Sequence, residues 1–258
     1  MGEWIGRLGR RAARLGRQGM DLLCPPRCLH CQAELPAGYG EILLCTACCE
    51  ALGPADWPGC PRCGALEDAD WAMSAAGCPN CSHRGLHFQT VIPLGPYDGA
   101  LRDAVLKTKR SLQEPMVLAL GQLLLRRRER QLSDFRPDLV VPIPMHWIRR
   151  FRRGVNSPEL LAGCLGRRLQ SAVAERLLVR TRNTLPQKDL MPQDRFRNVR
   201  GAFRVRRGQR RRLQDSRVLL VDDILTSGAT CSEAAAVLRR AGASAVAAAV
   251  LARAQRRR

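Results

Sequence analysis

The stretch that decides the fold is Val218-Leu219-Leu220-Val221-Asp222-Asp223-Ile224-Leu225-Thr226-Ser227-Gly228-Ala229-Thr230. Four apolar residues run directly into two carboxylates, and a turn of small and hydroxyl-bearing residues follows before a helical pattern begins. The apolar run predicts a central parallel strand that is buried on both faces. The two acids then stand at the carboxyl end of this strand, where open α/β sheets bind their ligands.

The turn after the acids predicts an anion site. It offers hydroxyls, a flexible glycine and free backbone N–H groups at the start of a helix. Carboxylates beside such a turn fit a ligand that carries both sugar hydroxyls and a phosphate, as ribose 5-phosphate does. The simpler alternative is a structural strand–turn–helix corner in which an aspartate caps the helix.

These thirteen residues resemble the motif with which type I phosphoribosyltransferases bind 5-phosphoribosyl diphosphate (PRPP). In that family the acid pair binds the ribose 2′- and 3′-hydroxyls, and the turn wraps the 5′-phosphate. The resemblance assigns Asp222 and Asp223 to the sugar. It implies a phosphate cradle made of Thr226, Ser227, Gly228, Ala229 and Thr230.

The chain is strongly basic. Its 258 residues include 43 Lys+Arg against 23 Asp+Glu, which gives a formal net charge of +20. Such a surface attracts polyanions, including single-stranded DNA, without reading their sequence. A general bias of the genome toward Arg and Ala is the alternative explanation.

Residues 1–23 predict a basic amphipathic helix, in which Trp4, Ile5 and Leu8 share a face and arginines surround them. This helix fits an anchor on anionic lipid, an arm on nucleic acid, or docking on the segment that follows. The chain has neither a long apolar run nor a secretory signal. These features predict a cytoplasmic location, with peripheral contact at the inner face of the membrane as an extension.

Cysteine pairs dominate residues 24–88. Ten of the twelve cysteines lie between Cys24 and Cys81, and in a cytosolic protein such clustering indicates metal rather than disulfides. Each C-x-x-C knuckle offers two thiolates, and two knuckles complete a closed tetrahedral zinc site. The predicted ligands are Cys28, Cys31, Cys45, Cys48, Cys60, Cys63, Cys78 and Cys81.

The spacing of these pairs predicts a double zinc ribbon with two structural zinc ions, four cysteines each. Thirteen residues separate the first two pairs and fourteen separate the last two. An interleaved arrangement, in which the first and third pairs share a metal, is the alternative. Cys24 and Cys49 remain as free thiols or substitute ligands. Because so short a segment buries little core, zinc would supply much of its folding energy.

Residues 89–258 alternate strand and helix patterns, which predicts an α/β domain with a parallel sheet flanked by helices. Strands are expected at 90–94, 138–141, 218–221 and 245–251. Helices are expected at 100–109, 115–131, 158–169 and 231–241. Residues 180–200 are polar and lack apolar periodicity, which predicts a long loop.

Two segments of this domain are candidates for binding a diphosphate. Pro142-Ile143-Pro144 ends a strand abruptly, and an arginine cluster that includes Arg153 and leads to Asn156 follows. Backbone donors and fixed positive charge are what a diphosphate requires. The long basic loop can close as a lid and exclude water, with Arg182, Lys188 and Arg195 as its closing charges. A solvated basic turn and a disordered loop are the alternatives.

Taken in order along the chain, these segments resemble the ComF family. The features that carry the resemblance are the cysteine knuckles, Tyr97-Asp98-Gly99, Leu106-Lys107, Pro142-Ile143-Pro144, Arg153-Gly154-x-Asn156, Gln187, Arg197-Asn198 and the acid-pair motif. The resemblance implies a zinc-ribbon head on a phosphoribosyltransferase domain, PRPP with Mg²⁺ as ligand, and a role in natural competence and DNA uptake. Val155 and Ser157 depart from the family's usual Phe and Gln. Ser227 replaces the family's usual second threonine and keeps the hydroxyl.

Three functions fit these expectations. The first is a PRPP-binding protein of natural competence, and the second is an active phosphoribosyltransferase of nucleotide or nitrogen metabolism. The third is a non-enzymatic PRPP sensor or DNA-binding adaptor. A transferase would displace diphosphate from the ribose C1 with a nitrogen nucleophile, and cations would stabilise the leaving group. The sequence shows no element that reads a base.

Overall fold

The structure is a computed structural model that describes residues 25–36, 39–40, 42–66, 78–109, 114–145, 156–185, 190–191 and 194–255. Its helices are α2 (Thr46–Leu52), α3 (Gly99–Lys107), α4 (Glu114–Arg127), α5 (Glu129–Phe135), α7 (Ser157–Leu169), α8 (Asp194–Val199), α9 (Ala229–Arg240) and the 3-10 helix η2 (Arg210–Leu213). Its strands are β1 (Thr90–Pro96), β2 (Leu139–Pro142), β3 (Ala172–Val173), β4 (Leu178–Arg180), β5 (Phe203–Val205), β6 (Arg217–Leu225) and β7 (Ala245–Arg253).

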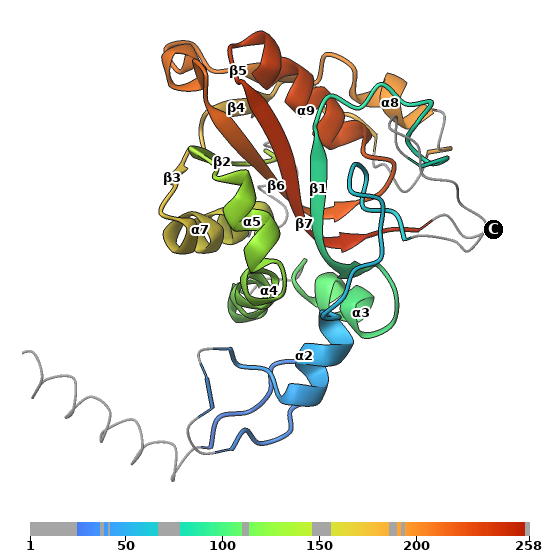
Figure 1. Ribbon diagram of the computed structural model, residues 1–258, viewed down its shortest axis with the longest axis vertical. Helices are drawn as coiled ribbons and strands as arrows, with labels where there is room; N and C mark the ends of the chain where they lie inside the picture. Colours follow the sequence, from blue (N-terminus) through green and yellow to red (C-terminus); the bar gives the residue numbers. More distant parts are fainter. Residues whose placement is uncertain are drawn as a thin grey trace, which may run out of the picture.

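A five-stranded sheet forms the centre of the molecule (Figure 1). Its strand order is β1-β7-β6-β2-β3, and every neighbouring pair is parallel. The quoted apolar run lies in β6, where Val218 to Val221 have no exposed surface. The predicted parallel α/β fold is therefore confirmed.

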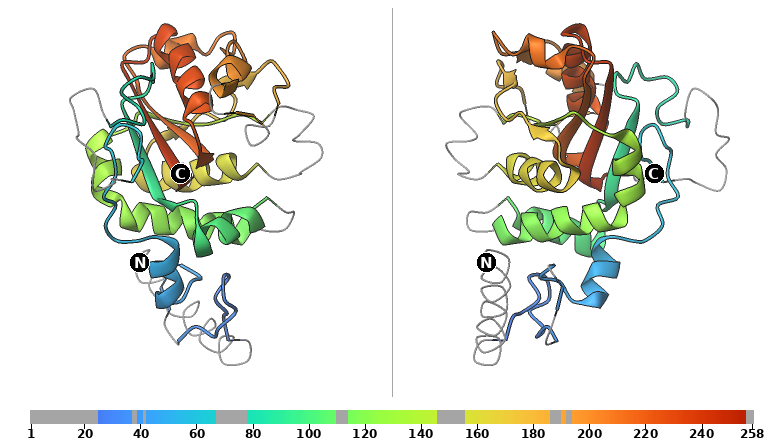
Figure 2. Two further views of the ribbon diagram at one scale, coloured as in Figure 1. Left: turned by 90° about the vertical axis from the view of Figure 1, so that its right-hand side faces the viewer. Right: turned by 60° about the vertical axis from the view of Figure 1, so that its left-hand side comes forward.

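Helices cover both faces of this sheet (Figure 2). Alternate residues of a strand point to opposite faces, so β7 supplies both cores. Ala247, Ala249 and Leu251 pack on the side of α3, α4 and α7. Ala248 and Val250 pack on the side of α9.

The helix expected over 115–131 is interrupted, because α4 ends at Arg127 and α5 begins at Glu129. Arg128 stands at the break and is 3% exposed. Its guanidinium donates hydrogen bonds to the carbonyls of Ala55 at 2.8 Å and Pro54 at 3.0 Å, and to those of Pro93 at 2.9 Å and Leu94 at 3.0 Å. Arg128 thus ties the head segment to β1.

The long loop expected over 180–200 is partly ordered. β4 and β5 pair antiparallel at its two ends, and α8 lies between them. Phe203 and Val199 are buried, and the Arg180 guanidinium lies 5.4 Å from the Phe203 ring centre. These few large contacts order the segment although its sequence has no apolar period.

The cysteine-rich residues contribute to both cores of the sheet. Cys28, Cys48 and Leu52 belong to the core that contains α3 and α4. Cys60 and Cys81 belong to the core that contains α9. In the described part of the chain, no helix combines the length and apolar character that crossing a bilayer requires. The predicted helix over residues 1–23 lies outside the described residues.

Candidate functional site

The acid pair lies on the part of β6 that extends past its neighbour β2. The last paired residues of these strands are Val221 and Pro142. Consecutive residues of a strand point to opposite faces, so the two carboxylates diverge. Asp223 Oδ2 lies 3.6 Å from Lys109 Nζ, just after α3, whereas Asp222 lies near the charge of Arg180 on β4.

Asp222 sits in an environment that disfavours its charged form. Burial raises the pKa of Asp222 well above its ordinary value, and the neighbouring charge of Asp223 raises it further. The backbone N–H of Asp223, which donates to Asp222 Oδ1 at 2.9 Å, acts in the opposite direction, as does the charge of Arg180. A ligand that brings hydroxyl donors or a cation would relieve this cost.

The turn after β6 is held by its carbonyl groups. Arg253 donates to the carbonyl oxygens of Leu225 at 3.3 Å and Thr226 at 2.6 Å. Arg84 donates to the carbonyl of Ser227 at 3.3 Å. Gly228 follows with φ of +82°, a left-handed conformation that suits glycine, and caps α9.

This arrangement aims three N–H groups at one side of the turn. In a trans peptide the carbonyl of one residue and the N–H of the next point in opposite directions, and the structure has no cis peptide among its described residues. The N–H groups of Thr226, Ser227 and Gly228 therefore point away from the two guanidiniums. Within the described residues these N–H groups form no hydrogen bond. Three open N–H groups at a helix start form an anion cradle.

Two further segments meet near the acids. Ser157 Oγ donates to the carbonyl of Thr108 at 3.2 Å, which places the start of α7 beside the residue before Lys109. Asn156 is 5% exposed, and neither of its side-chain amide atoms has a hydrogen-bond partner among the described residues. A buried unpaired amide normally has an unseen partner, and the role of Asn156 as a ligand contact stays a prediction.

Two other predicted ligand residues, Arg182 and Arg195, bond to main-chain carbonyls of their own segment. Arg182 donates to the carbonyl of Arg200 at 2.6 Å, and Arg195 donates to the carbonyl of Leu190 at 3.2 Å. Both guanidiniums therefore brace the 180–200 segment in this conformation. Arg153 and Lys188 lie outside the described residues.

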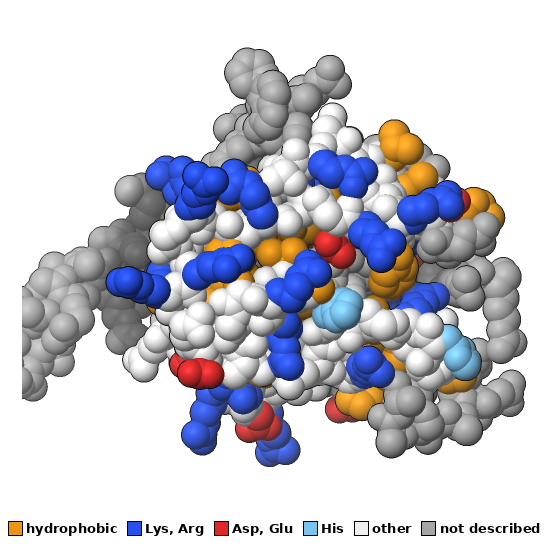
Figure 3. Space-filling model, turned by 90° about the horizontal axis from the view of Figure 1, so that it is seen from above, with side chains coloured by type: hydrophobic (Ala, Val, Ile, Leu, Met, Phe, Trp, Pro, Cys, Tyr) orange, Lys and Arg blue, Asp and Glu red, His pale blue; other side chains and the backbone are white. Residues whose placement is uncertain are grey.

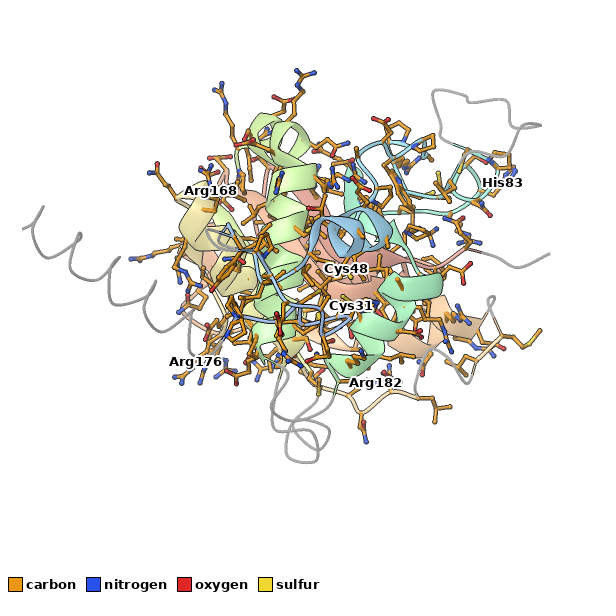
Figure 4. The ribbon with its side chains drawn as sticks, turned by 90° about the horizontal axis from the view of Figure 1, so that it is seen from below. Cys31, Cys48, His83, Arg168, Arg176 and Arg182 are labelled. Carbon is orange, nitrogen blue, oxygen red and sulfur yellow. The ribbon has the colours of Figure 1, made fainter. Side chains whose placement is uncertain are left out.

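The predicted zinc ligands form two separate groups. The first cluster consists of Cys28, Cys31, Cys45 and Cys48, and the second cluster of Cys60, Cys63, Cys78 and Cys81. Figure 4 labels Cys31 and Cys48 beside α2, while His83, which follows the second cluster, lies well away from them. The pairing is therefore sequential, and the interleaved alternative does not occur.

The sulfur positions in both clusters fit a tetrahedral metal. Sγ–Sγ distances are 3.7 Å for Cys31–Cys45, 3.6 Å for Cys63–Cys78 and 3.8 Å for Cys60–Cys81. Four thiolates at the usual Zn–S distance of about 2.3 Å lie about 3.8 Å apart. Each cluster can therefore hold one zinc ion in a closed, structural shell.

One thiol in each cluster has a lowered pKa and therefore ionises more readily than an ordinary cysteine. Burial raises the pKa of Cys28, but hydrogen bonds from the backbone N–H groups of Cys31, Cys45 and His30 outweigh it and lower the pKa to about 6. Cys60 behaves in the same way, with a pKa of about 7. Thiolates are the form that binds zinc. Cys49 is buried outside the first cluster, and Cys24 lies outside the described residues.

Exposed arginines gather at the end of the molecule opposite α2. Figure 3 views this end from above and shows Lys and Arg side chains across it, with few acids. The arginine face, as we call it, comprises Arg200, Arg204, Arg206, Arg207, Arg210, Arg211, Arg212, Arg239 and Arg240. It includes a cavity of about 470 Å³ between the β5 side and α9, lined by His87, Arg200, Glu233, Arg239 and Arg240.

Comparison with known proteins agrees with this geometry. The phosphoribosyl transferase domain family matches residues 179–258. The chain is 31% identical over 228 residues to the DNA utilization protein YhgH of Escherichia coli K12, covering 87% of this chain and 96% of that protein. The chain belongs to the ComF family. This ComF-family chain is also 28% identical over 219 residues to Competence protein F of Haemophilus influenzae, covering 84% of this chain and 92% of that protein.

Sequence reasoning missed three residues of the site. No role was predicted for Lys109, which pairs with Asp223. Arg84 and Arg253 lie outside every motif, and both bind the turn after β6. No local pattern marked Arg84 or Arg253, because the carbonyls that they bind belong to distant segments.

Proposed function

We propose that this ComF-family protein binds PRPP at the turn between β6 and α9 and acts in the uptake or use of single-stranded DNA during natural competence. The observation that carries the proposal is the turn itself. Arg84 and Arg253 donate hydrogen bonds to its carbonyls, its three N–H groups have no partner among the described residues, and two carboxylates precede it. The names of the relatives, a competence protein and a DNA utilization protein, supply the biological setting.

In this proposal the N–H groups of Thr226, Ser227 and Gly228 donate to the 5′-phosphate, and the hydroxyls of Thr226 and Thr230 add donors. Asp222 and Asp223 accept hydrogen bonds from the ribose hydroxyls, which offsets the burial of Asp222. Asn156 and Lys109 approach the diphosphate side. Bound Mg²⁺ would neutralise part of the diphosphate charge.

The arginine face is the proposed contact for single-stranded DNA. It presents nine exposed guanidiniums from β5, η2 and the end of α9, together with residues that flank these elements. Such an array follows a phosphate backbone without reading bases. Peripheral contact with the inner face of the membrane through residues 1–23 is part of the same setting and rests on sequence alone.

Calorimetric titration of the purified, zinc-loaded protein tests the ligand. PRPP and ribose 5-phosphate should bind with similar dependence on Asp223, and Asp223→Asn should weaken both by at least about tenfold. Asp138→Asn is the matched control, because Asp138 is exposed at the opposite edge of the sheet and bonds to the backbone N–H of Arg217 at 2.7 Å. Absence of binding by the unaltered protein would overturn the proposal. Diphosphate release with ammonia or bases as acceptors separates a transferase from a binder.

Transformation frequency tests the biological role. Deletion of the gene should abolish uptake or use of external DNA. An Arg239→Glu/Arg240→Glu protein should restore it poorly, and an Arg130→Glu protein should restore it fully, because Arg130 is exposed on α5, away from the arginine face. Normal transformation after deletion would reject the competence role while leaving PRPP binding intact.

A further inference from the structure

Arg253 is the deepest cation of the site. It is 4% exposed at the end of β7, and its guanidinium donates hydrogen bonds to the main-chain oxygens of Cys63, Leu225, Thr226 and Ala254. Nε donates to the carbonyl of Cys63 at 2.7 Å, and Nη1 donates to the carbonyl of Thr226 at 2.6 Å. One planar group therefore joins the second cluster to the phosphate turn.

The second cluster supplies the negative charge that this buried guanidinium needs. A buried cation without an opposite charge is costly. Burial lowers the pKa of Arg253, and the charges of the Cys63, Cys78 and Cys81 thiolates oppose this effect. Four thiolates around one Zn²⁺ retain a net charge of about −2, so the loaded cluster is a compact anion next to Arg253.

The chain that follows the second cluster packs on the same turn. Arg84 bonds to the carbonyl of Ser227, and the N–H of His87 donates to Ser232 Oγ at 3.1 Å in the first turn of α9. A Cβ added to Gly228 would lie 3.4 Å from Phe88 Cζ. The segment from Arg84 to Phe88 thus covers the back of the turn.

The first cluster has a different position. Its residues belong to the core that contains α3 and α4. Near the acids, its segment contacts the domain through the hydrogen bond from Lys107 Nζ to the carbonyl of His30 at 3.4 Å. No residue of the first cluster bonds to the phosphate turn among the described residues.

We propose that Arg253 is a positioning residue that couples the second cluster to the phosphate turn, so that zinc in this cluster sets the affinity for the 5′-phosphate. The inference rests on the proposed PRPP site and deepens it. With zinc bound, Arg253 and Arg84 hold the three carbonyls, and the N–H groups stay aimed at the ligand. When zinc leaves, the knuckle at Cys63 loosens and the turn loses this support.

The experiment measures ribose 5-phosphate affinity and zinc content for the full chain. Arg253→Lys keeps the charge but cannot bridge both carbonyls, and it should weaken ribose 5-phosphate binding by at least about tenfold with zinc retained. Arg128→Lys is the matched control, since Arg128 is equally buried and also binds carbonyls, but ties the head to β1. It should change the affinity by less than about twofold.

A pair of cluster variants separates the two zinc sites. Cys81→Ser and Cys31→Ser should each lower the zinc content by about one ion. Cys81→Ser should weaken ribose 5-phosphate binding at least about fivefold more than Cys31→Ser does. Equal losses in the two variants would overturn the inference.

The outcomes also separate this inference from the proposed function. Failure of the unaltered protein to bind ribose 5-phosphate refutes the PRPP site itself. Normal binding by Arg253→Lys refutes the coupling and leaves the PRPP site standing. If Arg253→Lys does not fold, Arg84→Gln replaces it, because this change removes one carbonyl bond from a half-buried position. An unchanged affinity in that variant overturns the coupling.

Discussion

Gly228→Ala places a methyl group at the turn that receives the proposed 5′-phosphate. Gly228 has φ of +82°, and an added Cβ would meet Phe88 Cζ at 3.4 Å and Leu86 Cδ2 at 3.6 Å. These are ordinary van der Waals distances, so space does not forbid the substitution. The cost lies in the backbone, because an L-residue in the left-handed region is less stable by roughly 1–2 kcal/mol.

This cost divides between stability and binding. If the free turn keeps its shape, the protein loses the full amount of folding free energy, which lowers Tm by about 2–8 °C for a chain of this size. If the free turn relaxes, the strain returns when ligand restores the left-handed shape, and affinity falls by up to about thirtyfold. The two losses should therefore add up to about 1–2 kcal/mol.

Gly208→Ala is a control of the same conformation. Gly208 also has φ of +82°, its added Cβ meets nothing within 4 Å, and it is exposed on the turn after β5. Chemical denaturation and calorimetric titration with ribose 5-phosphate should show a similar stability loss and unchanged binding. The reasoning fails if Gly228→Ala loses neither stability nor affinity, or if Gly208→Ala weakens binding as much.

Three further predictions follow from the site. The pKa of Asp222 is raised in the folded state, so its ionisation lowers the stability of the fold as pH rises from the ordinary Asp range through the folded value. Asp222→Asn should therefore have a higher denaturation midpoint than the unaltered protein at pH 8 and the same midpoint near pH 4. The variant should still lose PRPP binding. Chelation of about two zinc ions per chain should lower Tm by more than about 10 °C, and a metal-free protein with unchanged Tm would contradict structural zinc. A plot of the logarithm of the affinity for single-stranded DNA against the logarithm of the salt concentration should have a slope near −3, for about four phosphate contacts. Arg239→Glu should make this slope shallower. An affinity that does not depend on salt would exclude the arginine face as the DNA contact.

The sequence predicted the central strands and the clustered cysteines well, because the patterns that indicate them lie within short stretches of the chain. Four apolar residues before two acids are enough to indicate a buried parallel strand, and β6 has that form. The C-x-x-C spacing identified all eight clustered cysteines, since two thiolates of a knuckle are near neighbours in the chain. Their pairing needed the structure, because knuckle spacing is the same in both arrangements.

What could not be predicted depends on contacts between distant segments. Arg253 lies just past the strand expected over 245–251, close to three further arginines. Its partners are 190 residues away at Cys63 and 27 residues away at Thr226. The helix break at Arg128 has a similar cause, since the carbonyls that bind this side chain belong to the head and to β1. The apolar periodicity of α4 gives no information about these distant carbonyls, so it could not predict the break.

The strand order has a consequence for how the protein is made. β1 lies at one edge of the sheet, and its neighbour there is β7, which follows all the other strands in the chain. During translation β1 emerges from the ribosome early, and its apolar side chains stay unpaired with β7 until nearly every other element has been synthesised. The cysteine segments emerge before β1 and pack around it, so metal loading during translation would shield this strand from aggregation. Zinc supply during growth would then govern the yield of folded chains as well as their final stability.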